Sequence, residues 1–213
     1  MKKKILSLVL VFALALALGI GGTVAWLTAQ TGSVVNTFTI GDINIELWEH
    51  KYDLATDALT TEKTTINDNY EYVPGDTLPK DPFVVVKDDS EPCYVFVKID
   101  ETNNAFTADA NGKFVNYTVD SSKWTALGGT YSGIYWCKFN SKLSGDQEIN
   151  VLKDKTVTIS SAITETIAEE TLEKTKPVLT FTAYAIQSAN LPGLTADDAA
   201  NAVIAWKQLN GIQ

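Results

Sequence analysis

The apolar residues of this chain alternate with polar ones over most of its length, which is the two-residue period of a β-strand. In the sequence CYVFVKI, for example, Cys93, Val95 and Val97 fall on one face of a strand, and Tyr94 and Phe96 fall on the other. The stretches predicted as strands are 38–47, 83–87, 93–99, 113–119, 134–139, 156–160 and 178–187. Because turns rich in Gly, Pro and Asn separate them and no alternation of strands with helices occurs, we predict an all-β fold, an antiparallel β-sandwich of the jelly-roll type.

Residues 161–174 are either a short helix or an irregular excursion, because helical spacing of Ile163 and Ile167 is offset by several threonines. In the chain after the N-terminal signal, only the C-terminal segment has a clear helix pattern. Thr195 and Asp198 resemble a capping box at its start, and Asn210-Gly211 is a stop signal. The apolar stripe that we expect to pack on the sandwich consists of Ala199, Val203 and Trp206. The predicted fold is therefore a β-sandwich with one short C-terminal helix.

The N-terminus has the pattern of an export signal. Three lysines precede an apolar run over 5–20, and small residues stand just before Trp26. A cut between Ala25 and Trp26 would remove a signal helix, residues 1–25, and leave one domain, residues 26–213. If it stays uncut, the apolar segment is long enough to cross a bilayer, so a membrane anchor is the alternative reading. Three glycines near its end weaken a helix there and favour cleavage.

Cleavage would create an uncharged N-terminal arm, residues 26–35, in front of the first predicted strand. The apolar residues of the arm and of that strand are the candidates for an assembly contact: Trp26, Leu27, Val34, Val35, Phe38 and Ile40. Such an arm can pair with an exposed sheet edge, because an edge strand has unpaired backbone groups. Donation to a neighbouring subunit would give a head-to-tail filament, whereas pairing with its own sheet would give a closed monomer. The sequence leaves both outcomes open.

The composition argues against several classes of partner and of catalytic site. All seventeen basic residues are lysines and the net charge is -9, which argues against a nucleic-acid partner because arginine forks and positive charge are missing. Contact with a membrane is expected only through an uncleaved signal. His50 is the only histidine, so the chain lacks the paired histidines of a zinc peptidase. We therefore predict no metal, no cofactor and no catalytic residues.

Two cysteines, Cys93 and Cys137, each lie in a predicted strand. In an exported protein they could form a disulfide, worth roughly 4 kcal/mol in the chain-entropy model, or remain two buried thiols. In both cases the expected role is structural.

Three segments resemble the TasA/camelysin family of exported proteins. They are GIGGTVAWLTAQTGSVVNTFTIGDINIEL near the N-terminus, VPGDTLPKDPFVVVKDDSEPCYVFVKI in the middle, and AYAIQSANLPGLTADDAANAVIAW near the C-terminus. The resemblance implies a jelly-roll sandwich and export from a Gram-positive bacterium through a SipW-type signal peptidase. As for TasA, it implies a fibre subunit of the biofilm matrix, located in the extracellular matrix or at the cell surface. Camelysin is described as a surface metalloprotease, so the family by itself leaves the activity open.

We therefore expect a secreted, non-enzymatic structural protein whose copies self-associate into filaments through an N-terminal donor strand. The alternative is a camelysin-like secreted metallopeptidase, which rests on the resemblance alone. A weaker alternative is a surface module that binds carbohydrate. Its aromatic residues would be Trp124, Tyr131, Tyr135 and Trp136, which the strand pattern assigns equally well to core packing.

Overall fold

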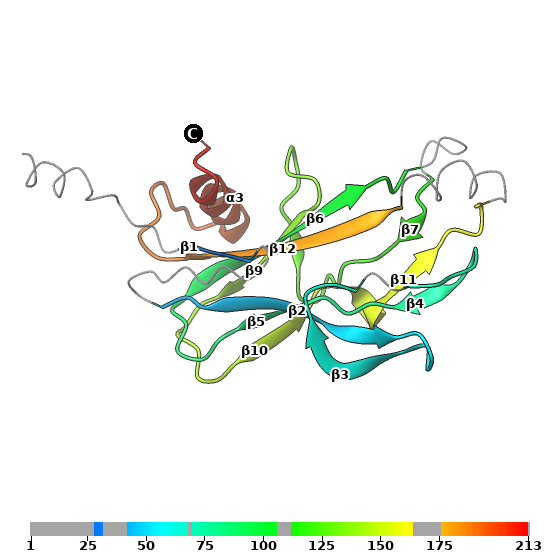
Figure 1. The fold of residues 1–213 in the computed structure, drawn as a ribbon. Helices are drawn as coiled ribbons and strands as arrows, with labels where there is room; N and C mark the ends of the chain where they lie inside the picture. The colour runs from blue at the N-terminus through cyan, green and yellow to red at the C-terminus, as the bar shows by residue number, and fades with distance from the viewer. Residues whose placement is uncertain (1–27, 32–41, 68–69, 106–111, 164–175, 213) are drawn as a thin grey trace, which may run out of the picture.

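The computed structural model describes residues 28–31, 42–67, 70–105, 112–163 and 176–212. Antiparallel strands make up most of this part of the chain, and one short α-helix follows them near the C-terminus (Figure 1). The predicted all-β class with a C-terminal helix is thus confirmed. Several predictions lie outside the described residues: the signal helix 1–25 with the cleavage site at Ala25 and Trp26, and the arm and strand residues Leu27, Val34, Val35, Phe38 and Ile40.

The largest sheet has five strands and is called the five-stranded sheet below. Its order is β1 (Thr28–Thr31), β12 (Val178–Gln187), β6 (Cys93–Thr102), β9 (Ile134–Phe139) and β8 (Thr125–Ala126). The two long strands β12 and β6 pair along their whole length, from Val178 opposite Thr102 to Gln187 opposite Cys93. The strands predicted at 134–139 and 178–187 have the bounds that the structure gives them, because their alternation is uninterrupted.

Two smaller sheets lie against one face of the five-stranded sheet (Figure 1). The four-stranded sheet has the order β10 (Gln147–Asn150), β5 (Phe83–Val86), β2 (Ile45–Asp53) and β3 (Ala58–Thr64). The three-stranded sheet has the order β4 (Thr77–Pro79), β11 (Thr156–Ile159) and β7 (Val115–Asn116), and the short 3-10 helix η1 (Lys153–Lys155) precedes β11. The strand predicted at 113–119 was too long, since only the two residues of β7 pair with β11.

A hydrophobic core fills the space between the two layers. Its fully buried centre includes Val84, Val86, Val95, Val97, Ala183 and Ala185. The alternation predicted for 93–99 is confirmed: Val95 belongs to this core, whereas Tyr94 and Phe96 belong to a second core on the opposite face of the five-stranded sheet. The sheet is therefore buried on both faces.

The helix α3 (Asp198–Leu209) covers that second face (Figure 1). Its buried apolar side chains are Ala202, Ala205 and Trp206, and Trp206 packs on Phe96 with 5.3 Å between the ring centroids. The predicted stripe was wrong in two of three positions, because Ala199 is exposed and Val203 is only half-buried. The helix is rotated so that Trp206 and its neighbours meet the aromatic face of the sheet.

The start of α3 also differs from the prediction. The N-cap is Asp197, whose carboxylate accepts a hydrogen bond from the amide of Ala199 at 2.9 Å. Thr195 instead binds the side chain of Asn201, which accepts from the Thr195 amide at 2.7 Å. The predicted stop is confirmed, since Asn210 is the C-cap and Gly211 has a positive φ of 63°.

Candidate functional site at the edge of the five-stranded sheet

The N-terminal strand β1 forms the edge of the five-stranded sheet. It pairs antiparallel with β12, with Thr28 opposite Ile186 and Thr31 opposite Ala183. These four residues belong to the arm that we predicted to seek an exposed sheet edge. In this structure residues 28–31 pair with the edge of their own sheet, which is the intramolecular pairing among the two outcomes that the sequence left open.

The receiving strand β12 is much longer than β1. β12 has ten residues and β1 has four, so β1 covers only Ala183 to Ile186. Within the described part of the chain, residues 178–182 of β12 pair with β6 on one side and with no strand on the other. An edge of unpaired backbone groups is a template for a further strand.

The two faces of β12 present different surfaces to a strand at this edge. Ala183 and Ala185 are fully buried in the core between the layers. Tyr184 and Ile186 belong to the second core, under α3. A strand paired with β12 therefore lies next to alanine side chains on one face of the sheet and next to larger side chains on the other face.

The single histidine is held by a buried carboxylate. Nδ1 of His50 lies 2.7 Å from Oδ2 of Asp81, and the backbone amide of His50 donates to the other carboxylate oxygen at 3.0 Å. Asp81 is 2% exposed. The contact between His50 and Asp81 joins β2 to the residues just before β5, so its role is structural.

Among the residues that the structure describes, no group of three or more His, Cys, Asp or Glu side chains is placed to hold a metal ion.

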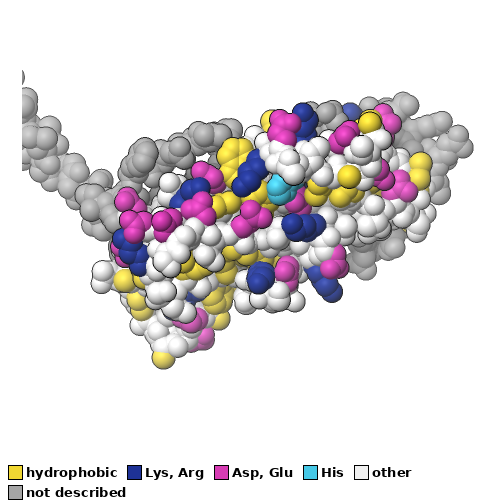
Figure 2. All heavy atoms as spheres, turned by 90° about the horizontal axis from the view of Figure 1, so that it is seen from below, with side chains coloured by type: hydrophobic (Ala, Val, Ile, Leu, Met, Phe, Trp, Pro, Cys, Tyr) yellow, Lys and Arg dark blue, Asp and Glu magenta, His cyan; other side chains and the backbone are white. Residues whose placement is uncertain are grey.

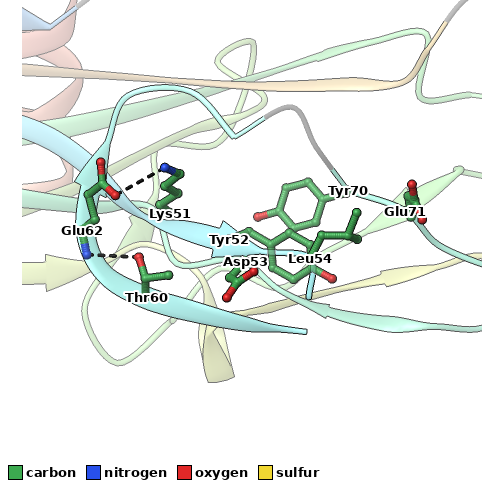
Figure 3. Close-up of a pocket in the computed structure, with 8 residues that line it drawn as sticks. All are labelled: Lys51, Tyr52, Asp53, Leu54, Thr60, Glu62, Tyr70 and Glu71. Carbon is green, nitrogen blue, oxygen red and sulfur yellow. Dashed lines mark hydrogen bonds and ion pairs between the residues drawn. The ribbon is translucent and has the colours of Figure 1, made fainter. Parts of the chain in front are cut away.

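One pocket of about 630 Å³ opens beside the β2–β3 hairpin (Figure 3). Its aromatic wall is formed by Tyr52 and Tyr70, which stack with 4.6 Å between ring centroids. Both hydroxyls are used inside the protein: that of Tyr52 donates to Asp57 at 2.8 Å, and that of Tyr70 donates to the carbonyl of Pro79 at 3.1 Å. Burial, followed by nearby carboxylates, raises the pKa of Tyr70, so this hydroxyl stays protonated. These rings stabilise the β2–β3 hairpin.

The outer face of the four-stranded sheet carries mixed charges. Figure 2 shows acidic and lysine side chains interspersed on the face seen from below, with hydrophobic atoms between them. Lys87, for example, lies 2.6 Å from Asp146 and 3.8 Å from Glu46. This face therefore has no broad patch of one sign.

The aromatic residues of the carbohydrate-binding alternative do not meet on one surface. Trp124 is 2% exposed, and its indole nitrogen donates to the carbonyl of Asn150 at 2.9 Å. Tyr135 packs against the core between the layers, whereas Tyr131 and Trp136 pack against the second core. The five-stranded sheet thus separates them, and each serves packing.

Cys93 and Cys137 lie on neighbouring strands, β6 and β9. Cys93 is opposite Phe139, and Cys137 is opposite Val95, so the two cysteines are diagonal neighbours on the face toward the core between the layers. Both are free thiols in this structure. Burial raises the pKa of each thiol to about 12. The disulfide that the sequence allows stays a prediction.

Comparison of the chain with protein-family models, with curated proteins and with solved structures gave no match. The helices within the described residues are all too short or too polar to cross a membrane.

Sequence reasoning missed the residues that receive the arm. The alternation of 178–187 predicted a strand and its two faces, but it carried no signal that β12 lies next to the edge. Strand order depends on contacts between distant segments, which a local pattern does not encode.

Proposed function

We propose that this protein is a secreted structural subunit of a biofilm matrix or cell-surface fibre of a Gram-positive bacterium. A SipW-type signal peptidase would cut between Ala25 and Trp26 and release the arm 26–35. Each subunit would then donate its arm to β12 of the next subunit. The proposal assigns no catalytic step, metal or cofactor to the protein, and contact with the membrane ends when the signal is removed.

The observation that carries the proposal is the pairing of β1 with the edge of β12. Within the described residues, β1 pairs with only four residues of β12. A longer donated arm would follow β12 farther. Continued in the same register, it would set Val34 opposite Thr180 and Val35 opposite Leu179 and would fill the open half of the edge. Donation in trans would thus add backbone hydrogen bonds along residues 178–182, which have no strand partner on that side among the described residues.

The geometry of the exchange favours an open filament. Each subunit has one donor arm and one acceptor edge, so the contact is head-to-tail and uses two different surfaces. Such a contact does not close on itself unless the rotation between subunits happens to form a ring. Removal of residues 1–25 takes away Lys2, Lys3 and Lys4 and changes the net charge from -9 to -12, which would keep the secreted subunits soluble before exchange.

We also propose that the two layers form a jelly-roll-like sandwich. Both larger sheets contain neighbouring strands that are far apart in the chain, as in the pairs β12–β6 and β10–β5, besides the consecutive pairs β8–β9 and β2–β3. The chain therefore passes repeatedly from one layer to the other, as it does in Greek-key sandwiches and jelly rolls.

Electron microscopy of the purified mature protein tests the fibre proposal. The expected result is filaments from residues 26–213 and none from residues 36–213. A double variant, Ala29→Pro with Gln30→Pro, keeps the length of the arm but removes two successive strand amides. Successive amides of a strand point to opposite sides, so at least one of the two faces β12. This variant should also fail to form filaments.

A matched control is Thr61→Pro in β3, which is an edge strand of the four-stranded sheet. Thr61 falls in the register shift between β2 and β3 and has no strand partner there, so its replacement should leave filament formation intact. Monomers from the unaltered mature protein under all secretion-like conditions, or filaments from the double proline variant, would overturn the proposal.

A further inference from the structure

The acceptor edge is in contact with the C-terminal helix through one aromatic pair. Trp206 of α3 meets Tyr184 of β12 nearly edge-on, with 5.2 Å between ring centroids and 85° between ring planes. Trp206 is 4% exposed. Tyr184 lies opposite Gln30 of β1, in the middle of the strand pairing at the edge. The helix therefore touches the residue of β12 that a seated strand lies beside.

The helix is fastened to the sheet away from this edge. Nζ of Lys138, on β9, lies 2.6 Å from Oδ1 of Asp198 in the first turn of α3. The hydroxyl of Tyr94, on β6, donates to the same carboxylate oxygen at 3.3 Å. β6 and β9 are the second and third strands from β1, so neither of these two contacts involves the edge.

Residues that lie directly opposite each other in an antiparallel pair have their side chains on the same face. A residue of an incoming strand that pairs with Tyr184 therefore comes to the face that α3 covers. A residue that pairs with Ala185 comes to the core between the layers. On the first of these faces, Trp206 contacts the ring of Tyr184.

Building on the proposed function, we propose that Trp206 and Tyr184 determine which strand the acceptor edge takes. They select against a bulky residue at the donor position opposite Tyr184, which is Gln30 in this chain. The partner that fits is the arm of a second copy, since its sequence provides an unbranched polar residue there. Trp206 acts through Tyr184 and is a positioning residue.

Peptide binding to the mature chain carrying Ala29→Pro and Gln30→Pro tests this inference, because the acceptor edge is then not filled by its own arm. The probes are fluorescent peptides of residues 26–35 with the native sequence, with Gln30→Trp, and with Ala29→Trp. The acceptor in which Trp206 is unchanged should bind the Gln30→Trp peptide about tenfold more weakly than the native peptide, a difference of about 1.4 kcal/mol. Trp206→Leu in the acceptor should reduce this ratio to less than about threefold.

Three controls separate selection from general destabilisation. Ile134→Ala disturbs the same core from β9, two strands away from β12, and should keep the tenfold ratio. The Ala29→Trp peptide, whose altered position lies opposite Ala185, should be rejected equally by all acceptors. Trp206→Phe keeps an aromatic ring and replaces Trp206→Leu if circular dichroism shows that the leucine variant is unfolded.

The outcomes distinguish the two proposals. A ratio that is unchanged in the Trp206 variants, or that falls equally in Ile134→Ala, overturns the selection by Trp206 and Tyr184 but leaves strand donation standing. If no peptide binds any acceptor, strand donation itself is wrong and the selection fails with it.

Discussion

The ammonium group of Lys80 lies 2.6 Å from Oε2 of Glu49, and only 10% and 12% of the two side chains are exposed. The pair joins β2 to the residues that follow β4, at the junction of the four-stranded and three-stranded sheets. The same ammonium also lies over the rings of Tyr70, at 5.6 Å, and Phe181, at 5.8 Å. The Lys80 ammonium thus contacts β2 of the four-stranded sheet, β12 of the five-stranded sheet, and Tyr70 in the segment before β4.

Removal of one partner of this pair should destabilise the fold strongly. Glu49→Leu leaves the Lys80 ammonium buried without its counter-charge, and we expect the free energy of unfolding to fall by about 3 to 5 kcal/mol. The surface pair of Lys51 and Glu62 is the control, since its members are 53% and 68% exposed. Glu62→Leu should change stability by less than about 1 kcal/mol. Urea denaturation measures both, and equal losses would contradict the importance of the buried pair.

Replacement of Gly133 by alanine should be costly. Gly133 has a positive φ of 77°, and a Cβ there would lie 2.8 Å from the carbonyl oxygen of Ile99. Gly129 also has a positive φ, 58°, but a Cβ there would meet nothing within 4 Å. Gly129→Ala should therefore cost about 1 to 2 kcal/mol for the left-handed conformation alone. Gly133→Ala should lower the free energy of unfolding clearly more, as measured by urea denaturation, because the backbone at Gly133 and at Ile99 of β6 also has to move apart.

Stability at acid pH should depend on Glu101. Burial by itself would raise the pKa of Glu101, but hydrogen bonds from Lys113, Tyr117 and Asn104 outweigh burial and leave the pKa below its usual value. The folded pKa is thus lower than the unfolded pKa. The ionised carboxylate stabilises the fold above pH about 4.5, and this contribution is lost as the pH falls through the lower, folded pKa.

A titration of urea stability from pH 7 to pH 3 checks this linkage. Glu101→Gln should lower stability at pH 7 and make the loss of stability below pH about 4.5 shallower than in the unaltered protein. Glu148→Gln on β10, where the side chain is exposed, is the matched control and should leave the slope unchanged. The linkage is wrong if the two variants give the same acid slope.

The two thiols should be unreactive in the folded protein. Because burial raises the pKa of Cys93 and Cys137 to about 12, the nucleophilic thiolate is scarce at pH 8.5. Iodoacetamide should therefore label the folded protein slowly and the urea-unfolded protein rapidly. An added exposed thiol, Ser144→Cys, should react rapidly in the folded state and serves as the control. Rapid native labelling of Cys93 would contradict the buried geometry.

The oxidation state can be read in the same samples. If the secreted protein forms the disulfide, its intact mass lacks two hydrogens and neither thiol reacts after unfolding. If the thiols stay free, both react after unfolding.

Stability at alkaline pH should also depend on the two thiols. Burial disfavours the thiolate and raises the thiol pKa in the folded state, so stability is full below pH about 9 and is lost as the pH rises toward about 12.

Local patterns were sufficient for the elements whose residues face two different environments. The alternation of Val95 with Phe96 predicted a strand with these residues on opposite faces, and the structure assigns them to two different cores. The C-terminal helix was also predictable, but its buried face was not. Which side chains it buries depends on the rings of Phe96 and Tyr184, which belong to strands far away in the chain.

The sequence by itself determined the class of fold, the two faces of the long strands and the stop of the helix, because side-chain period and backbone preference are local properties. Only the tertiary structure decided that β1 lies on the edge of β12, that Asp81 holds His50, and that Lys80 is buried against Glu49. Each of these joins residues that are distant in the chain. Their pairing follows from strand order and layer packing, which depend on the free energy of the whole fold and not on any single segment.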